Sequence, residues 1–461
     1  MTMTLKQEKL SQIPQVDRLL GSPPILDILA QYPRPIVTDV VREELERIRQ
    51  SILNNGDESF KTEPFIEKIQ VQIQKRLQPD LRRSINAAGI VLHTNMGRAP
   101  LSDVAKEALR EVAENYSNLE IDLDSGKRGS RYAHVENLLC ELTGAEAAMV
   151  VNNNAAATLL VLNSLAKDKE CLLSRGELIT IGDSFRLPEV MRQGGAKLVE
   201  VGSTNQTYVS DFEQAITEET ALVMKVHTSN YRIIGFFSEV TLQELVQLGH
   251  AKGLTVYHDV GSGALIDLSK YGLPKEPVIQ ESIAAGADVV SFSGDKLIGG
   301  PQAGIIVGKK DLIGKMKTNH LTRALRAGKL TYAALEATLR LFLDKETLSE
   351  NHAVLHMLTR KIGDLEVKAR KIVTDIGPTN LDLKIEDGLS EIGGGSLAAE
   401  SLPTKLVTIS SPQFSPDVLA GKLRKNRPPV ITRIQNNRVV LDMRTVREDE
   451  VDLIVLALQS I

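Results

Sequence analysis

The residue best placed for covalent chemistry is Lys296, in the segment SFSGDKLIGGPQAG from Ser291 to Gly304. Three glycines surround this lysine, and their missing side chains leave room for a planar ring to approach the backbone. An imine forms only from a neutral amine, and burial lowers the pKa of a lysine because it disfavours the charged form. A single lysine is more often a solvated surface residue, so the prediction depends on partners elsewhere in the chain.

A second segment, MVVNNNAAATLL from Met149 to Leu160, runs from an apolar strand directly into a helix. The start of a helix offers free backbone N–H groups and a positive dipole end to an anion such as a phosphate. We expect the donors to be Asn153, Asn154 and Ala155. Taken alone, the segment is equally consistent with a plain helix capped by asparagine.

Two further side chains complete the pattern. Asp259 in HDVGSG lies at a predicted strand end, where a carboxylate can pair with a protonated pyridine nitrogen, although it could also cap a helix. Ser293, three residues before Lys296, can place a hydroxyl on the same phosphate. The order of phosphate loop, aspartate and Ser-x-x-Lys is typical of the aminotransferase-like class, which uses pyridoxal 5′-phosphate. A GxGxxG fingerprint and a GxxxxGKS/T phosphate loop are both absent from the sequence.

These residues fall in a region, Ile85 to Phe342, where short β-branched segments alternate with amphipathic helical stretches. That alternation predicts an α/β fold of βαβ units on a parallel sheet. Such sheets bind ligands at the carboxyl ends of their strands, where the named residues stand. The expected strands are Ala147–Val151, Ala221–Val226, Leu254–Val260 and Asp288–Ser293.

The chain on either side of this region has other patterns, and we expect three domains. Residues 1–84 carry helical spacing from Val37 to Leu53 and from Phe65 to Leu77, interrupted by prolines, and predict a small helical domain. Residues 85–345 are the predicted catalytic domain. Residues 346–461 are expected to hold a linking helix and a small α/β domain.

The expected linking helix is a stretch rich in Leu and Lys from Tyr332 to Val373. Beyond it, short segments have the composition of strands, and the pair Asn436-Asn437 is typical of a tight hairpin turn between the last two. The expected strands are Thr404–Ser410, Pro429–Gln435 and Arg438–Arg444.

Composition narrows the class of protein. With 42% hydrophobic and 25% charged residues, the 461-residue chain matches a soluble globular protein. No apolar stretch reaches the roughly 20 residues of a membrane helix, and the amino terminus lacks a secretory signal, so we expect a cytoplasmic address. A net charge of -4 gives no overall basic footprint for nucleic acid. Cys140 and Cys171 are not in metal-binding spacing, and we expect no metal site.

Several long segments are similar to bacterial selenocysteine synthases, the L-seryl-tRNA(Sec) selenium transferases. They include QIPQVDRLL, INAAGIVLHTNMGRAPL, LEIDLDSGKRGSR, KVHTSNYRIIGF, LTRALRAGKLT, GGGSLAAESLPT and RPPVITRIQNNRVVLDMRTV, spread over nearly the whole chain. The resemblance implies the aminotransferase-like fold of pyridoxal phosphate enzymes (fold type I), with small N-terminal helical and C-terminal α/β domains. It also implies a ring-shaped homodecamer assembled from dimers.

The resemblance further implies a reaction. Lys296 would hold the cofactor as a Schiff base, the serine of seryl-tRNA(Sec) would lose its hydroxyl, and selenium from selenophosphate would replace it. Asp295 is similar to an acidic neighbour that helps the hydroxyl leave. Arg98, Arg323 and Arg326 match positions thought to hold selenophosphate, although each is also consistent with a solvated surface arginine. If their segment is helical, Arg323 and Arg326 would point to one side.

The same resemblance makes residues 1–84 the expected tRNA-binding domain, with Lys75, Arg76, Arg82 and Arg83 as local phosphate contacts. The sequence leaves several roles open. His227 and Arg175 are both candidates to lie over the cofactor ring, and the flexible segment holding Lys127, Arg128 and Arg131 could contact cofactor, substrate or a neighbouring subunit. An esterified serine has no free carboxylate, so Arg433 and Arg444 are left outside the site.

Two other functions compete with this one. A pyridoxal phosphate lyase or transferase acting on a small free amino acid would share the catalytic core but would not need residues 1–84. A non-catalytic RNA-binding scaffold would need no reactive lysine. Turnover of free amino acids distinguishes the first alternative, and a cofactor chromophore fixed onto Lys296 excludes the second.

Overall fold

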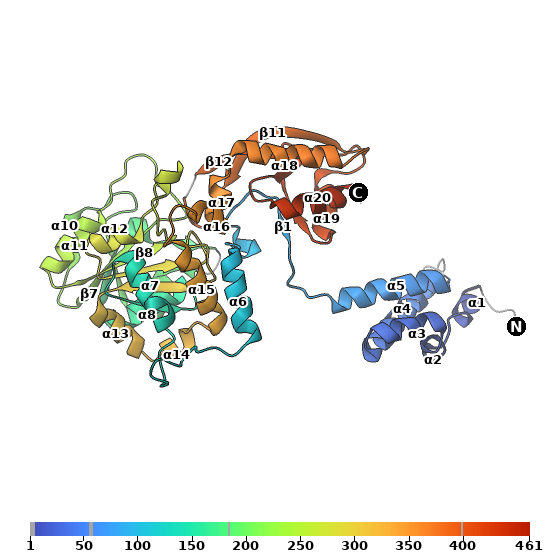
Figure 1. The fold of residues 1–461 in the computed structure, drawn as a ribbon, viewed down its shortest axis with the longest axis horizontal. Coiled ribbons are helices and arrows are strands. Elements are labelled where there is room, and N and C mark those ends of the chain that lie inside the picture. The colour runs from blue at the N-terminus through green and yellow to red at the C-terminus, as the bar shows by residue number, and fades with distance from the viewer. Residues whose placement is uncertain (1–4, 55–58, 183–184, 398–399) are drawn as a thin grey trace. The chain divides into compact units, whose positions relative to one another are not determined.

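The computed structural model describes residues 5–54, 59–182, 185–397 and 400–461. The chain divides into two compact units, Met1–Arg83 and Ser84–Ile461, and each is described by itself. Figure 1 shows the first unit as helices only and the second as a large α/β body with a smaller sheet and its helices near the C-terminus. The predicted division into three domains therefore stays a prediction, with the first boundary close to the one expected at residue 84.

The helical unit is built on a long amphipathic pair. Helix α4 buries Val37, Val41 and Ile48 on one side, and α5 buries Phe65 and Ile69, at the spacing of one or more helical turns. Proline at the first position of α3 supplies a fixed φ where its missing N–H is not needed. Both helices expected in this region are confirmed. The helices are α1 (Leu5–Ser11), α2 (Val16–Leu20), α3 (Pro23–Gln31), α4 (Arg34–Asn54) and α5 (Thr62–Leu77).

The second unit contains a seven-stranded sheet in the order β2-β10-β9-β8-β7-β3-β6. Its strands are β2 (Ala147–Val151), β3 (Glu170–Ser174), β6 (Lys197–Val201), β7 (Thr220–Val226), β8 (Thr255–Gly261), β9 (Val289–Ser293) and β10 (Gly304–Gly308). The four strands expected from the sequence are all present.

The expectation of a wholly parallel sheet is wrong for β10, which runs antiparallel to both β9 and β2. Only residues 294–303 connect β9 to β10. A parallel return needs a crossover of a dozen or more residues, usually a helix, so this connection forces the chain to reverse. The reversal places the Lys296 segment in the turn between the two strands.

Both faces of this sheet are buried, because alternate residues of one strand enter different cores. Ala148 and Val150 of β2 pack into one apolar cluster, and Met149 and Val151 pack into another. Figure 1 shows helices on both sides of the sheet. They are α6 (Asp103–Glu114), α7 (Ala133–Thr143), α8 (Asn154–Leu165), α9 (Leu187–Gln193), α10 (Val209–Ala215), α11 (Leu242–Ala251), α12 (Ile279–Ala284), α13 (Lys310–Thr318), α14 (Thr322–Leu325) and α15 (Lys329–Leu341).

The predicted single linking helix from Tyr332 to Val373 is wrong, since four helices occupy this stretch. Asp344 accepts hydrogen bonds from the backbone and hydroxyl of Thr347 and so stabilises a turn after α15. The His352 side chain then accepts from the Leu355 N–H and caps a new helix. The three helices that follow α15 are α16 (Leu348–Asn351), α17 (Ala353–Thr359) and α18 (Ile362–Asp375).

A smaller antiparallel sheet, in the order β11-β12-β15-β14, lies near the C-terminus. The expected hairpin is confirmed, because Asn436 and Asn437 both have positive φ between the paired Gln435 and Arg438. The segment expected as one strand from Pro429 is split into two. The elements are β11 (Asp382–Glu391), β12 (Ser401–Ser410), α19 (Pro416–Lys425), β13 (Val430–Ile431), β14 (Arg433–Gln435), β15 (Arg438–Asp442) and α20 (Val451–Gln459), and β13 pairs with β1 (Ile85–Asn86).

Candidate active site

Lys296 lines a cavity of about 270 Å³ beside the carboxyl ends of β8 and β9. Its side chain is 3% exposed. Burial, and next the nearby charge of Arg98, lower the pKa of its amine to about 8. At pH 7 roughly a tenth of the amine is therefore uncharged and can act as a nucleophile, far more than for an ordinary lysine. The other lining residues are Arg98, Asn153, Asn154, Ala155, Ile179, Ile181, Phe185, Val226, His227, Ser229, Asp259, Gly261, Ser293 and Gln302.

Asp259 is the buried carboxylate of this cavity, in β8 and 4% exposed. It accepts hydrogen bonds from Asn154 Nδ2 at 2.9 Å, from Thr158 Oγ1 at 3.0 Å and from Ser291 Oγ at 3.3 Å. Burial raises the pKa of its carboxyl, against the effect of these donors. Within the described ranges no cation lies at ion-pair distance from it, so a positively charged group entering the cavity would complete its environment.

Sequence reasoning missed Thr158 and Ser291. Ser291 precedes Ser293 by two residues in β9, so both lie on the same face of the strand, and this spacing could have identified it. Thr158 lies one helical turn after Asn154 in α8 and therefore on the same side of the helix. A polar threonine among apolar residues could have indicated that it has a buried polar partner.

The asparagine segment meets the cavity at the first turn of α8. Asn153 caps this helix, because its side-chain oxygen accepts from the Ala156 N–H at 2.8 Å. Asn154 instead turns its amide nitrogen to Asp259, and its Oδ1 finds no hydrogen-bond partner in the described structure. The N–H groups of Asn154 and Ala155 open the helix, where no residue four positions earlier can accept from them. The asparagine cap is thus confirmed, and phosphate binding by the first N–H groups of the helix stays a prediction.

Asp295 and Arg98 form an ion pair beside Lys296. Arg98 Nη1 donates to both carboxylate oxygens of Asp295, at 3.1 and 3.0 Å. Arg98 has a positive φ and follows Gly97, and its neighbour Ala99 donates its N–H to the Asp295 carbonyl. The structure therefore brings together Lys296, Asp295, Asp259, Ser293 and Arg98, although they come from distant parts of the chain.

Arg323 and Arg326 do not line this cavity. Helix α14 ends at Leu325, and Arg326 is extended and forms a β-bridge with Val151, so the expectation that both arginines share one helix face is wrong. Arg326 Nη1 lies 4.0 Å from Glu120 Oε1. Arg323 is exposed, and no ion pair is found for it in the part of the chain that the structure describes.

The structure shows where the residues lie whose roles the sequence left undecided. His227 lines the cavity, and its Nε2 lies 2.9 Å from Glu276 Oε2 without the geometry of a hydrogen bond. Arg175 does not line it, and pairs instead with Glu200 at 3.1 Å. Arg128 and Arg131 both contact Glu120, the carboxylate that also lies near Arg326, whereas Lys127 is exposed.

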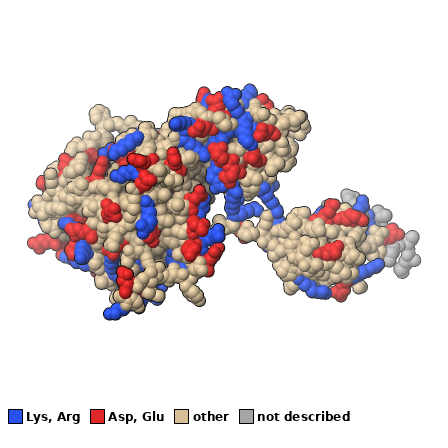
Figure 2. Space-filling view, viewed as in Figure 1, with Lys and Arg blue, Asp and Glu red and all other residues tan. Residues whose placement is uncertain are grey.

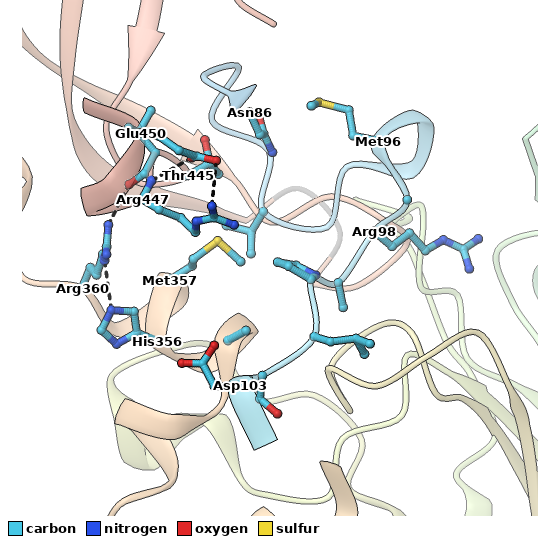
Figure 3. A pocket seen from close by; sticks show the side chains of 18 of the residues that line it. Asn86, Met96, Arg98, Asp103, His356, Met357, Arg360, Thr445, Arg447 and Glu450 are labelled. Atoms are coloured by element: carbon cyan, nitrogen blue, oxygen red, sulfur yellow. Dashed lines mark hydrogen bonds and ion pairs between the residues drawn. The ribbon is translucent and has the colours of Figure 1, made fainter. Parts of the chain in front are cut away.

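A larger cavity, of about 640 Å³, lies between α6, α17 and the segment after β15 (Figure 3). Several of its polar side chains pair with others in the cavity wall. Arg360 donates to His356 at 3.3 Å, and Arg447 pairs with Asp449 at 2.8 Å and with Glu450 at 3.4 Å. The Arg98 side chain points away from these groups in Figure 3. Size alone would favour this cavity, but the reactive set of residues surrounds the smaller one.

None of the described helices is both long and apolar enough to cross a membrane.

Comparison with known proteins identifies the family. The family model for L-seryl-tRNA selenium transferase matches residues 84–447, and a model for the selenocysteine synthase N terminus matches residues 10–49. The L-seryl-tRNA(Sec) selenium transferase of Alkaliphilus oremlandii is 48% identical over 458 residues, covering 98% of each chain. That of Carboxydothermus hydrogenoformans is 47% identical, covering 97% of this chain and 96% of the relative.

Among solved structures, D-glucosaminate-6-phosphate ammonia-lyase superposes with a TM-score of 0.59 at 22% identity, covering 84% of this chain and 97% of the other. This likeness concerns the fold alone, and it confirms the predicted aminotransferase-like class. The matches over nearly the full chain show that this protein belongs to the L-seryl-tRNA selenium transferase family.

Proposed function

We propose that this protein converts seryl-tRNA(Sec) to selenocysteinyl-tRNA(Sec), with pyridoxal 5′-phosphate as cofactor and selenophosphate as selenium donor. One observation carries the proposal: a buried amine with a lowered pKa and a buried carboxylate line one cavity, and no described cation lies at ion-pair distance from that carboxylate. A second supporting fact is the family to which the chain belongs.

The residues of the cavity fit pyridoxal phosphate. The cofactor supplies an electrophilic aldehyde and a ring that accepts electrons from the substrate's Cα. Lys296 would bind the aldehyde. Asp259, which has no described cation at ion-pair distance, would pair with the protonated ring nitrogen. The N–H groups of Asn154 and Ala155, with the Ser293 hydroxyl, would hold the phosphate. His227 lines the same cavity and is available to contact the ring.

Asp295 and Arg98 would assist the exchange of the serine hydroxyl for selenium. In the net exchange the serine's Cβ–O bond breaks and the hydroxyl leaves as water, a Cβ–Se bond forms, and a water takes up the phosphoryl group as the Se–P bond breaks, which gives phosphate. Asp295, beside Lys296, would hold the proton that the departing hydroxyl takes up. Arg98 bridges this carboxylate and the cavity, so its guanidinium would meet an anionic selenium donor next to the reacting carbon.

Arg323 and Arg326 are proposed as further contacts to selenophosphate. The resemblance of LTRALR to the family supports these roles, and the exposure of Arg323 leaves its guanidinium available. We also propose the ring-shaped homodecamer of dimers with active sites at dimer interfaces, because a second subunit could bring such arginines to a cavity that they do not line within one chain.

Binding of the tRNA is assigned to the helical unit, Met1–Arg83. Figure 2 shows Lys and Arg interspersed with Asp and Glu on the visible face of each unit, so recognition would depend on shape and local phosphate contacts rather than on a broad positive field. Arg76 of the expected contact set pairs with Glu43 at 3.0 Å, and Arg82 donates to Gln78. A cytoplasmic location, where aminoacylated tRNA is used, is part of the same proposal.

The test is a reconstitution. Purified protein loaded with pyridoxal phosphate is incubated with serine-charged tRNA(Sec) and selenophosphate, and the aminoacyl group is released and identified by mass spectrometry. We expect selenocysteine only when all three components are present. Parallel reactions contain free serine, cysteine or a phosphorylated amino acid in place of the charged tRNA. Conversion of these by the full chain and by residues 84–461 alike, without tRNA turnover, would overturn the proposal in favour of a free amino acid enzyme.

A further inference from the structure

We propose that the glycine loop, defined as Gly393–Leu397, and Ser229 together bind the ester group of the substrate, with the Ser229 hydroxyl donating to the uncharged ester carbonyl oxygen. This inference rests on the proposed function, in which the serine is esterified to its tRNA. It identifies the part of the site that distinguishes an esterified serine from a free one.

The glycine loop lies directly against the reactive amine. A Cβ placed on Gly395 would be 3.4 Å from Lys296 Nζ and 3.3 Å from Ser229 Oγ. Ser229 lines the Lys296 cavity and is 1% exposed, and its Oγ has no hydrogen-bond partner among the described residues. A buried hydroxyl without a partner is costly, so a carbonyl oxygen beside Lys296 would satisfy it.

All three glycines of the loop have a φ between 64° and 74°, which favours glycine, but their surroundings differ. A Cβ on Gly393 would collide with the Ile90 side chain, and a Cβ on Gly394 would lie 2.8 Å from Leu92. At Gly395 no described atom outside its chain neighbours is closer than 3.3 Å. Close packing therefore adds a second reason for glycine at Gly393 and Gly394 but not at Gly395. The position that a Gly395 side chain would fill faces the amine, which is where the substrate's own substituents must fit.

The loop is held in place from both ends. Its first neighbour, Ile392, accepts the Leu92 N–H at 2.7 Å. At the other end, the Leu397 N–H donates to Glu276, the buried carboxylate that also approaches His227. Leu397 has a φ of 51°, which is unfavourable for a residue with a branched side chain. A loop fixed in this way presents Gly395 to Lys296 as a preformed wall.

Ser229 also lines a second cavity, of about 360 Å³, together with Gly395. Its described lining contains no Lys, Arg or His, and it includes Glu391 and Glu400, the latter paired with Arg232. Ser396, 2% exposed, adds another hydroxyl that has no hydrogen-bond partner among the described residues. A free carboxylate entering here would meet two acidic side chains and no cation in the described lining, since the neighbouring Arg232 is paired with Glu400, whereas an ester and its ribose carry no charge. The chemistry of this wall thus favours the ester.

The test compares L-serine methyl ester with free L-serine by following the absorbance of the cofactor in the full-length protein. We expect the ester to half-saturate the spectral change at a concentration at least about tenfold below that of free serine. In Ser229→Ala and Gly395→Ala this preference should fall to near unity, through weaker ester binding. The cofactor spectrum before titration should be unchanged in both variants.

Gly377→Ala is the matched control for Gly395→Ala, since Gly377 has a nearly equal φ of 70° and open space around it. It carries the same backbone strain without touching the site, and thermal unfolding of the three variants reports any loss of fold. Equal affinity of the wild-type protein for ester and free acid, or wild-type preference in both site variants, would overturn the inference. Conversion of seryl-tRNA by the wild type is measured in parallel, so that failure of the proposed function is recognised separately.

Discussion

Two cavities of the α/β unit, the one lined by Arg447 and the one lined by Lys296, differ in how their polar groups are satisfied. In the larger of the two, of about 640 Å³, Arg360, Arg447 and His356 find partners within the cavity wall. In the smaller, of about 270 Å³, Asn154 and Ser229 each have a buried oxygen without a hydrogen-bond partner among the described residues. No lining residue of the larger cavity in the described ranges has such an atom. A buried unsatisfied group costs about 1–3 kcal/mol, so its persistence indicates a ligand more reliably than volume does.

Lys368 and Lys296 are both buried and both have a lowered pKa, but only one of them faces a cavity. Burial lowers the pKa of Lys368 to about 7, yet its amine donates to the carbonyls of Met443 and Val446. Lys296, with a pKa lowered to about 8, faces a cavity. A perturbed pKa marks a reactive group only where a substrate can reach it.

The largest effect on activity is expected from removal of the amine in the smaller cavity. Lys296→Ala should abolish conversion of seryl-tRNA and the absorbance of the protein-linked cofactor, because no other described lysine lines this cavity. After borohydride treatment of the wild type, peptide mapping should find the cofactor on Lys296 and not on Lys368. Full activity of Lys296→Ala would remove the basis of the proposed function.

Asp259→Asn should have the next largest effect. Loss of the buried carboxylate removes the charge that stabilises a protonated ring, and kcat should fall on the order of 10²- to 10³-fold. Asp288→Asn is the control: Asp288 is equally buried but precedes β9, at the opposite end of the strand from Lys296, and pairs with His250 and Lys309. Similar losses in kcat for the two variants would show that Asp259 acts only on the fold.

The pH dependence of cofactor uptake tests whether the pKa of Lys296 is lowered. Only the neutral amine reacts, so the rate at which cofactor-free protein binds pyridoxal phosphate should rise with pH and level off above about 8. Roughly a tenth of Lys296 is neutral at pH 7, which predicts about a tenfold increase across this range. Stopped-flow absorbance measures the rate. A rise that continues toward the ordinary lysine pKa would contradict the burial argument.

The smallest effect is expected in the larger cavity. Arg447 is half exposed, and its partners are the exposed Asp449 and, at 3.4 Å, the buried Glu450, which still accepts from the backbone N–H of position 447 after substitution. Arg447→Ala should therefore change the free energy of unfolding by only about 1 kcal/mol. Its kcat/KM for seryl-tRNA should stay within about twofold of the wild type. A large loss of kcat/KM with an unchanged cofactor spectrum would instead assign the larger cavity to substrate binding.

Much of the fold could be predicted from local pattern. The four expected strands, the two long N-terminal helices and the Asn436-Asn437 hairpin depend on hydrophobic period and turn residues, which act over a few positions. The same holds for Lys296 in its glycine-rich turn and for the start of α8. What failed was the antiparallel β10, set by the length of its connection, and Arg326, where a bridge to Val151 ends the helix.

The sequence by itself determined which residues are chemically able to act: a glycine-flanked lysine, an aspartate near a strand end and a helix that begins at asparagine. Only the tertiary structure decided which of them meet. Thr158 and Ser291 on Asp259, Glu276 on the glycine loop, and Gly395 against Lys296 are contacts between segments far apart in the chain. Their physical reason is packing and burial across the whole sheet: spacing within one segment indicates the face on which Thr158 or Ser291 lies, but not the distant side chain that it meets.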